Sequence, residues 1–95
     1  MKQYNPVYIW FYVDTDANER DNDLTEIEIK RFKNELEAEE YSDALDLKKI
    51  LGILKRKKIS IPKEVKAVAA VVTTVFDYGD YEDDICQSYE NLFVL

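Results

Sequence analysis

The sequence contains no histidine, one cysteine, two glycines and two prolines in 95 residues. Without histidine the chain lacks the commonest general base and a principal zinc and copper ligand. A single cysteine, Cys86, excludes an intramolecular disulfide and any metal site built on several thiolates. A glycine-rich phosphate loop and the GxSxG and HExxH motifs are missing as well. We therefore expect no enzyme, no catalytic residue, no metal site and no cofactor.

Export and membrane signals are also missing. The apolar run at residues 7–13 ends in Asp14, Thr15 and Asp16 instead of a small-residue cleavage site. No segment approaches the roughly 20 apolar residues of a membrane span. Together with the lone cysteine, this predicts a cytoplasmic protein that does not engage a membrane. The length predicts a single domain over residues 1–95, and 46% hydrophobic residues are typical of a globular chain.

Positive charge is missing from the last third of the chain. Residues 67–95 contain no lysine or arginine and carry a net charge of −6; residues 1–29 carry −5, residues 30–66 carry +4, and the whole chain carries −7. If the chain ends meet in the fold, as they often do, one acidic and one basic surface result. The basic block of the middle segment comprises Lys48, Lys49, Lys55, Arg56, Lys57, Lys58, Lys63 and Lys66.

Residues 7–13 (VYIWFYV) predict a strand, because they are β-branched or aromatic throughout. The alternation of a strand sends residues 7, 9, 11 and 13 to one face, which we assign to the core. It sends Tyr8, Trp10 and Tyr12 to the other face, as a second buried layer or a contact surface.

Two helices are expected next. Thr25 and Glu28 have the spacing of a capping box, which predicts a helix over residues 26–40. Ser42 is placed to cap a second helix over residues 43–57. Gly52 lies inside that helix and predicts close packing against a neighbour. The buried stripe of the second helix is expected to contain Leu47, Ile50, Leu51 and Leu54.

The pattern after Pro62 is compatible with a helix or a strand. We predict a short helical turn there, followed by a strand over residues 68–78 that pairs with residues 7–13, and a turn at Gly79. Residues 80–95 fit either a helix or a strand. The predicted architecture is a small single α+β domain, in which a small β-sheet packs against a two-helix pair.

The segment after the first strand resembles part of a calcium loop. Asp14, Asp16 and Asn18 match the first three ligands, but Glu19 stands where glycine is required and Thr25 where a bidentate glutamate is expected. A solvated acidic loop explains this segment without a metal. Further oxygens nearby leave a weak, irregular cation site open, and they belong to Asp21, Asp23 and Glu26.

Residues 77–84 place five carboxylates and two phenols within eight positions. Carboxylates along a surface can imitate nucleic-acid phosphates, and tyrosines are typical interface residues. The predicted partner-binding residues are Asp77, Tyr78, Asp80, Tyr81, Glu82, Asp83 and Asp84, with the acids of residues 14–28 as a second cluster. This predicts a non-enzymatic acidic protein that engages a basic, nucleic-acid-binding protein surface and inhibits it. In size and charge the chain is similar to small acidic phage-encoded anti-defence proteins and nucleic-acid mimics, although no motif aligns.

Three other interpretations stay open. The basic block at residues 48–66 suits a nucleic-acid-binding or regulatory module, although no aromatic residue is interleaved in Lys55, Arg56, Lys57 and Lys58. A self-associating structural subunit would join the acidic ends of one copy to the basic middle of the next. The acidic segment at residues 77–84 could also serve solubility alone.

Overall fold

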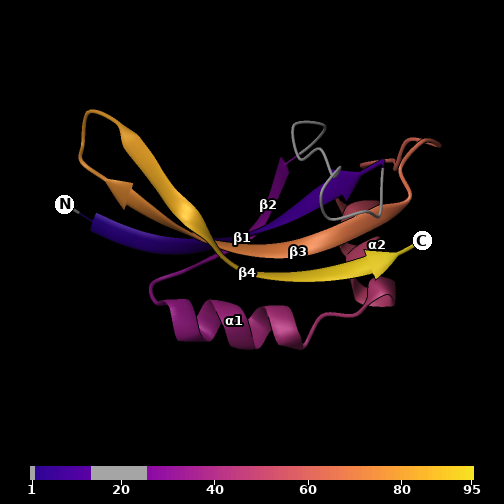
Figure 1. Cartoon of the computed structure of the whole chain (residues 1–95), viewed down its shortest axis with the longest axis horizontal. Coiled ribbons are helices and arrows are strands. Elements are labelled where there is room, and N and C mark those ends of the chain that lie inside the picture. The colour runs from indigo at the N-terminus through magenta and orange to yellow at the C-terminus, as the bar shows by residue number, and fades with distance from the viewer. Residues whose placement is uncertain (1, 14–25) are drawn as a thin grey trace.

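The computed structural model describes residues 2–13 and 26–95, and within these it describes residues 83–88 as backbone only. Across these ranges four strands and two helices follow one another: β1 (Lys2–Tyr12), β2 (Glu26–Phe32), α1 (Glu35–Asp43), α2 (Leu47–Arg56), β3 (Ala67–Asp77) and β4 (Glu82–Val94). The strands form one antiparallel sheet in the order β2-β1-β3-β4, and both helices lie on one of its faces (Figure 1). The α+β class and the small sheet packed against helices are confirmed.

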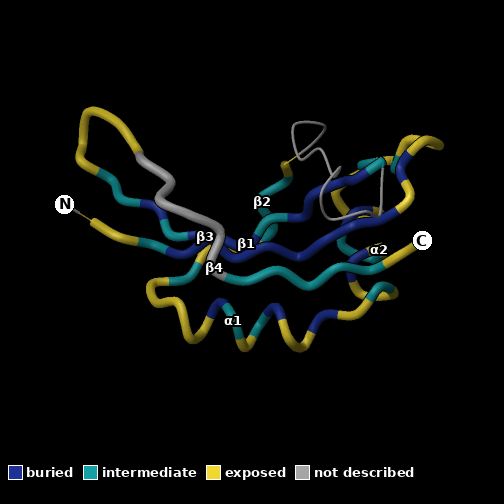
Figure 2. Tube along the Cα trace, in the orientation of Figure 1, coloured by how far each residue is buried: buried dark blue, intermediate teal, exposed yellow. Residues whose placement is uncertain are grey.

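The core lies between the helices and the two central strands, β1 and β3, which are the most deeply buried part of the chain (Figure 2). Ile9 and Phe11 of β1 pack with Ile50 and Leu54 of α2, and Val7 packs with Ala38 of α1. Large apolar side chains of this kind contribute roughly 1.5–3 kcal/mol each when they are fully buried. The prediction that the odd-numbered residues of this strand face the core is therefore confirmed for residues 7, 9 and 11.

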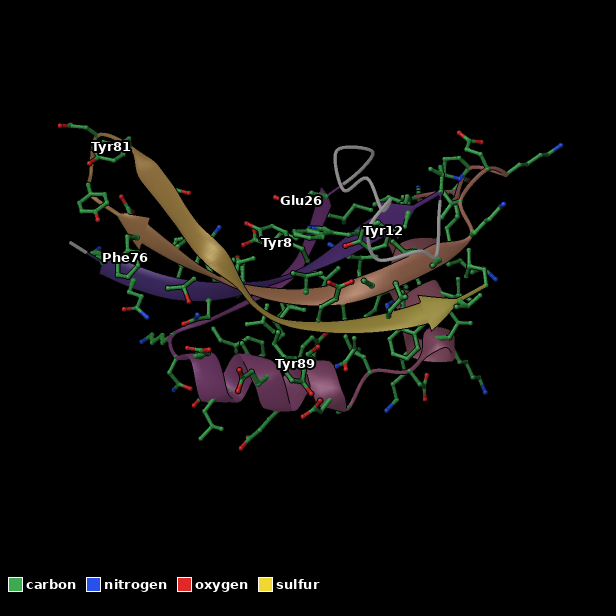
Figure 3. The ribbon with its side chains drawn as sticks, viewed as in Figure 1. Tyr8, Tyr12, Glu26, Phe76, Tyr81 and Tyr89 are labelled. Atoms are coloured by element: carbon green, nitrogen blue, oxygen red, sulfur yellow. The ribbon has the colours of Figure 1, made fainter. Side chains whose placement is uncertain are left out.

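The even-numbered residues of β1 form a second buried layer on the face without helices. Trp10 and Tyr12 are only 6% and 3% exposed, and their rings meet edge to face with centroids 6.4 Å apart. They lie opposite Ala69 and Ala67 of β3, whose small side chains leave room for the rings. Figure 3 shows Tyr8 and Tyr12 on this face. Of the two interpretations of this aromatic set, burial holds for Trp10 and Tyr12.

The helix predicted over residues 26–40 is wrong in its first half, because Glu26–Phe32 is the edge strand β2. Ile27 and Ile29 pack against the core that the helices also cover. The alternation of apolar and polar residues in this segment is therefore that of a strand with one face on the core. Glu28 binds Arg31 through two hydrogen bonds of 3.0 and 3.2 Å, and it caps no helix. Thr25 lies outside the described residues. Pairing with β1 outweighs the local capping signal, as tertiary context often outweighs propensity.

The helices begin later than predicted. The side chain of Asn34 accepts a hydrogen bond from the backbone N–H of Glu37, and that of Asp46 accepts one from Lys49, each at 2.8 Å. Ser42, the predicted cap, is instead buried in the last turn of α1. There its hydroxyl accepts a hydrogen bond from Asn91 Nδ2 of β4 at 3.3 Å. Contact with β4 therefore explains this serine, and the break between the helices falls at residues 44–46.

Two expectations about α2 are also corrected. Ile50 and Leu54 are buried and Leu47 is half-buried. Leu51 is 40% exposed, because it lies beside the helix face that packs on the sheet and not on it. A Cβ placed on Gly52 would meet nothing closer than Arg56 Nη1 at 3.9 Å. Gly52 therefore permits no close approach of a neighbour.

The last third of the chain forms strands where the sequence left helix and strand open. Val65 N–H donates to the carbonyl of Pro62 at 3.1 Å, which closes a single turn before β3. β3 confirms the predicted strand almost residue for residue, and residues 82–94 form a strand. Lys2 lies beside Asp77, whereas Val94 lies beside Ala67 at the other end of the sheet. The two ends of the described chain therefore do not meet, and the condition for a single acidic surface is not fulfilled by them (Figure 1).

Candidate binding surface

The β3–β4 hairpin (residues 77–84) extends beyond the helices at one end of a molecule measuring 40 × 25 × 22 Å (Figure 1). Asp77 and Glu82 pair at its base, and residues 78–81 form its tip. The tip is held by a hydrogen bond from Tyr78 N–H to the carbonyl of Tyr81 at 3.0 Å. Gly79 has φ 92°, a conformation that glycine adopts without strain, and its N–H donates to Asp77 Oδ1 at 2.8 Å. Asp77 therefore fixes the shape of the turn.

The tip carries two tyrosines that face solvent. The rings of Tyr78 and Tyr81 stack with centroids 4.9 Å apart and planes inclined by 24°, and the side chains are 43% and 62% exposed. Asp80 lies between them in sequence and is also exposed. Figure 3 places Tyr81 at the far end of the molecule, away from α1. The result is a preformed aromatic pair with carboxylates beside it.

The base of the hairpin is anchored to β1 by a hydrogen bond, and a residue of β2 packs on the anchoring side chain. Tyr4 of β1 donates its phenol hydrogen to Glu82 at 2.8 Å, and the Arg31 guanidinium lies 3.9 Å from the centre of the Tyr4 ring. Burial, followed by this hydrogen bond to Glu82, raises the pKa of Tyr4 to about 12. The hydrogen bond to Glu28 raises the pKa of Arg31. Glu82 is therefore an anchor of the hairpin as well as part of its charge.

Of the predicted site residues, the structure brings Asp77, Tyr78, Asp80, Tyr81 and Glu82 together. Asp83 and Asp84 lie in β4 opposite Phe76 and Val75, and their side chains are outside the described part, as is that of Cys86. Tyr4 and Arg31 were not predicted, because nothing local in the sequence links them to residues 77–84.

Most of the second predicted cluster falls outside the described residues. Its acids at residues 14–25 and the calcium-like motif lie outside the described residues, while Glu26 and Glu28 lie on β2. Glu28 is already engaged by Arg31. Among the described side chains, those of residues 2–13, 26–82 and 89–95, no three of the metal-binding types converge. No helix in these ranges is both long enough and apolar enough to cross a membrane.

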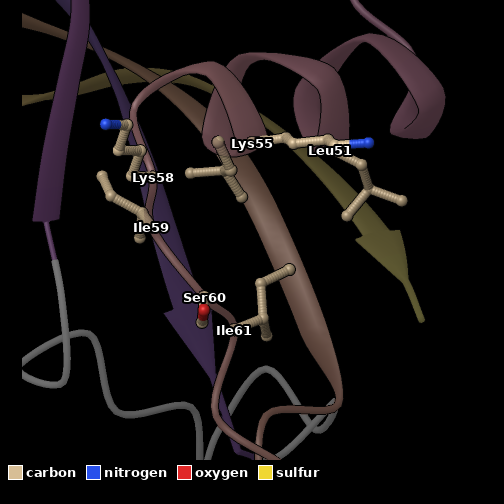
Figure 4. A pocket seen from close by; sticks show the side chains of 7 residues that line it. Leu51, Lys55, Lys58, Ile59, Ser60 and Ile61 are labelled. Carbon is tan, nitrogen blue, oxygen red and sulfur yellow. The ribbon is translucent and has the colours of Figure 1, made fainter.

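The basic block gathers around α2, towards the other end of the long axis (Figure 1). All eight of its side chains are exposed. An open groove of about 540 Å³ lies between α2 and residues 58–61 (Figure 4). We call it the α2 groove; the side chains that line it include Leu51, Leu54, Lys55, Lys58, Ile59 and Ile61.

No protein-family model matches this chain, and no curated protein and no solved structure is significantly similar to it. Function is therefore inferred from the described residues themselves, chiefly from the hairpin and the α2 groove.

Proposed function

We propose that this chain is a non-enzymatic cytoplasmic binding protein whose β3–β4 hairpin occupies a basic, nucleic-acid-binding surface of another protein and so inhibits it. The observation that carries the proposal is the exposed Tyr78–Tyr81 stack, which sits on a projecting hairpin with Asp80 at its tip and Glu82 at its base. An acidic segment alone would serve solubility, whereas two stacked, solvent-facing rings are typical of a contact surface.

The chemistry of the hairpin resembles what a nucleic-acid groove binds. Such grooves hold a strand through lysines and arginines that contact phosphates, and through side chains that stack on bases. Carboxylates offer the same negative charge, and the faces of Tyr78 and Tyr81 offer π surfaces for arginine or aromatic partners. Both features are present in one short hairpin.

The hairpin is also preorganised. Asp77 holds the turn and Tyr4 holds Glu82, so little conformational freedom remains to be lost when a partner binds. Ordering of interface loops and side chains is one of the main costs of association. A hairpin fixed in advance therefore uses more of its contact energy as affinity.

The pKa shifts of two tyrosines do not suit acid–base catalysis. The hydrogen bond from Tyr89 to Asp43 raises the pKa of Tyr89, and the pKa of Tyr4 is raised to about 12. Both shifts move the pKa values of these phenols further above neutral pH. A general acid or base works best with a pKa near the operating pH, so these shifts do not favour catalysis.

The test uses immobilised wild type and two variants, each exposed to nuclease-treated lysate and eluted with salt. The hairpin variant, Asp80→Asn with Tyr81→Ala, removes the ring stack but leaves Asp77 and Glu82 in place, so the side-chain hydrogen bond of the turn and the anchor to Tyr4 are kept. The control, Glu40→Gln with Leu36→Ala, makes the same kind of change on α1, where both side chains are exposed. We expect a basic nucleic-acid-binding protein to be retained by wild type and control and lost from the hairpin variant.

The inhibitory part of the proposal needs a second measurement. The captured protein, mixed with a labelled oligonucleotide, should lose its nucleic acid as wild type is added, but not as the hairpin variant is added. Equal capture by all three proteins, or a ternary complex with the oligonucleotide, would contradict the proposal. Retention of nucleic acid by wild type without nuclease, lost in Lys55→Glu with Lys57→Glu, would favour the basic block instead.

A further inference from the structure

We infer that the α2 groove receives the β3–β4 hairpin of a second copy of this chain, so that copies associate head to tail. The inference uses the same hairpin as the proposed function but adds a site of its own, on the opposite part of the molecule. It names another molecule of this protein as a partner, which would compete with any other basic partner for the hairpin.

The α2 groove combines apolar and cationic surface. Leu54 lines the groove and is buried, and Leu51 of α2 is 40% exposed. Ile59 and Ile61 line the groove from the segment that follows α2 (Figure 4). Lys55 and Lys58 are among the residues that line it, and both side chains are exposed. A cavity of about 150 Å³ holds one benzene molecule, so an open groove of about 540 Å³ has room for two phenol rings.

The hairpin has the complementary composition. Residues 77–84 hold five acids and no cation, whereas residues 47–58 hold six cations and no acid. The aromatic pair Tyr78 and Tyr81 suits the apolar lining, and Asp80 is adjacent to it for Lys55 or Lys58 of the other molecule. This pairs apolar with apolar surface and negative with positive charge across one contact.

The two surfaces cannot meet within one molecule, because the hairpin lies at one end of the 40 Å axis and α2 lies towards the other. A contact between two different patches is heterologous, and it generates open chains or a ring instead of a closed two-fold dimer. The net charge of −7 opposes association at long range. At about 0.1 M salt the screening length is near 10 Å, which weakens distant repulsion more than contacting pairs.

The test is sedimentation equilibrium at about 0.1 M salt on four proteins, with concentration as the variable. The hairpin variant is Asp80→Asn with Tyr81→Ala, and the groove variant is Lys55→Glu with Lys58→Glu. A control with the same change of charge, Lys63→Glu with Lys66→Glu, alters exposed cations outside the groove. We expect the mass of wild type and control to rise with concentration. The hairpin variant and the groove variant each keep only one of the two surfaces, so we call them one-faced variants. Each of them alone should associate at least roughly tenfold more weakly than wild type.

The decisive sample is an equimolar mixture of the two one-faced variants. The intact hairpin of one variant then meets the intact groove of the other, so the mixture should form dimers and nothing larger. This outcome also shows that both variants are folded. A wild type that stays at 11.2 kDa, variants that associate as wild type does, or a mixture that stays monomeric would each overturn the inference.

Two further outcomes separate the alternatives. If wild type stays monomeric and binds a labelled single-stranded oligonucleotide that the groove variant does not bind, the groove belongs to nucleic acid and the inference fails. If wild type stays monomeric but still captures a basic protein through the hairpin, the inference fails while the proposed function stands.

Discussion

Gly52 shows how a single residue can be misread from sequence. A glycine inside a helix suggests close packing, yet the space above Gly52 is open, and the nearest atom to an added Cβ is Arg56 Nη1 at 3.9 Å. Replacing it with alanine removes the entropy penalty of glycine without a clash, so Gly52→Ala should raise the free energy of unfolding by up to about 1 kcal/mol. Urea denaturation measures this, with Gly79→Ala as the contrast: at φ 92° the same change should be destabilising. A loss of stability in Gly52→Ala would mean that α2 has no room for a side chain at this position.

Tyr4 gives the hairpin a specific dependence on pH. Its pKa in the folded protein is about 12, above the ordinary value of 10.0, so the folded state holds the phenol proton more tightly than the unfolded state. The stabilisation is complete below pH 10 and is lost as the pH rises from 10 to 12. We expect the stability of wild type to decline relative to Tyr4→Phe across this interval in urea titrations. Glu82→Gln removes the charged acceptor and should show a smaller decline; a constant difference between wild type and Tyr4→Phe would refute the anchor.

At the residue scale, the sequence identified the acids and tyrosines of the hairpin but not the contacts that hold them. Residues 77–84 are conspicuous because charge, phenols and Gly79 occur together. The bond between Tyr4 and Glu82 joins residues 78 positions apart, and it follows only from the pairing of β1 with β3 and of β3 with β4. Such contacts depend on register, which local patterns do not determine.

At the scale of elements, α1 is poorly matched to its own helix dipole. Its first turn contains acids, which is favourable, but its last turn contains no basic residue. Glu40→Lys should therefore raise the free energy of unfolding by about 0.3–1 kcal/mol, whereas Glu35→Lys should lower it by a similar amount. The two variants change the net charge equally, so the difference between their urea midpoints isolates the position in the helix. Equal effects of the two would show that overall charge, and not the dipole, decides.

Helices and strands that are favoured by the pattern of their own residues could be predicted from the sequence. Strands that form only because an adjacent strand pairs with them could not. The strand at 68–78 follows from its β-branched run, and the second helix follows from apolar residues three and four positions apart. β2 and β4 are edge strands, each stabilised by a single neighbour. Their polar, partly helical patterns indicate a helix or are ambiguous, because pairing and not propensity makes them strands.

At the scale of the whole molecule, the described residues place two charged features apart along the long axis. The acidic hairpin lies at one end, and the basic residues of α2 lie towards the other (Figure 1). The sequence showed the separation along the chain, and one acidic surface was expected only on the condition that the chain ends meet. Because β1 and β4 run antiparallel to β3, the chain ends are held at opposite ends of the sheet instead.

The same sheet order has a consequence for folding. Every pair between β1 and β3 joins residues separated by more than half of the chain, from Tyr12 with Ala67 to Lys2 with Asp77. Long-range pairing of this kind is slow, because a large loop must close first.

A fragment ending at Lys66 lacks β3, the central strand with which β1 pairs. We therefore expect this fragment to show an unfolded circular dichroism spectrum and to aggregate. A stable folded fragment would contradict the need for β3.

During synthesis, β1 is the first strand made and yet a central one. Ile9, Trp10 and Phe11 emerge early and stay without one of the two partner strands of β1 until β3 has left the ribosome. For most of translation, one of the most apolar stretches of the protein is therefore exposed to chaperones and to other nascent chains.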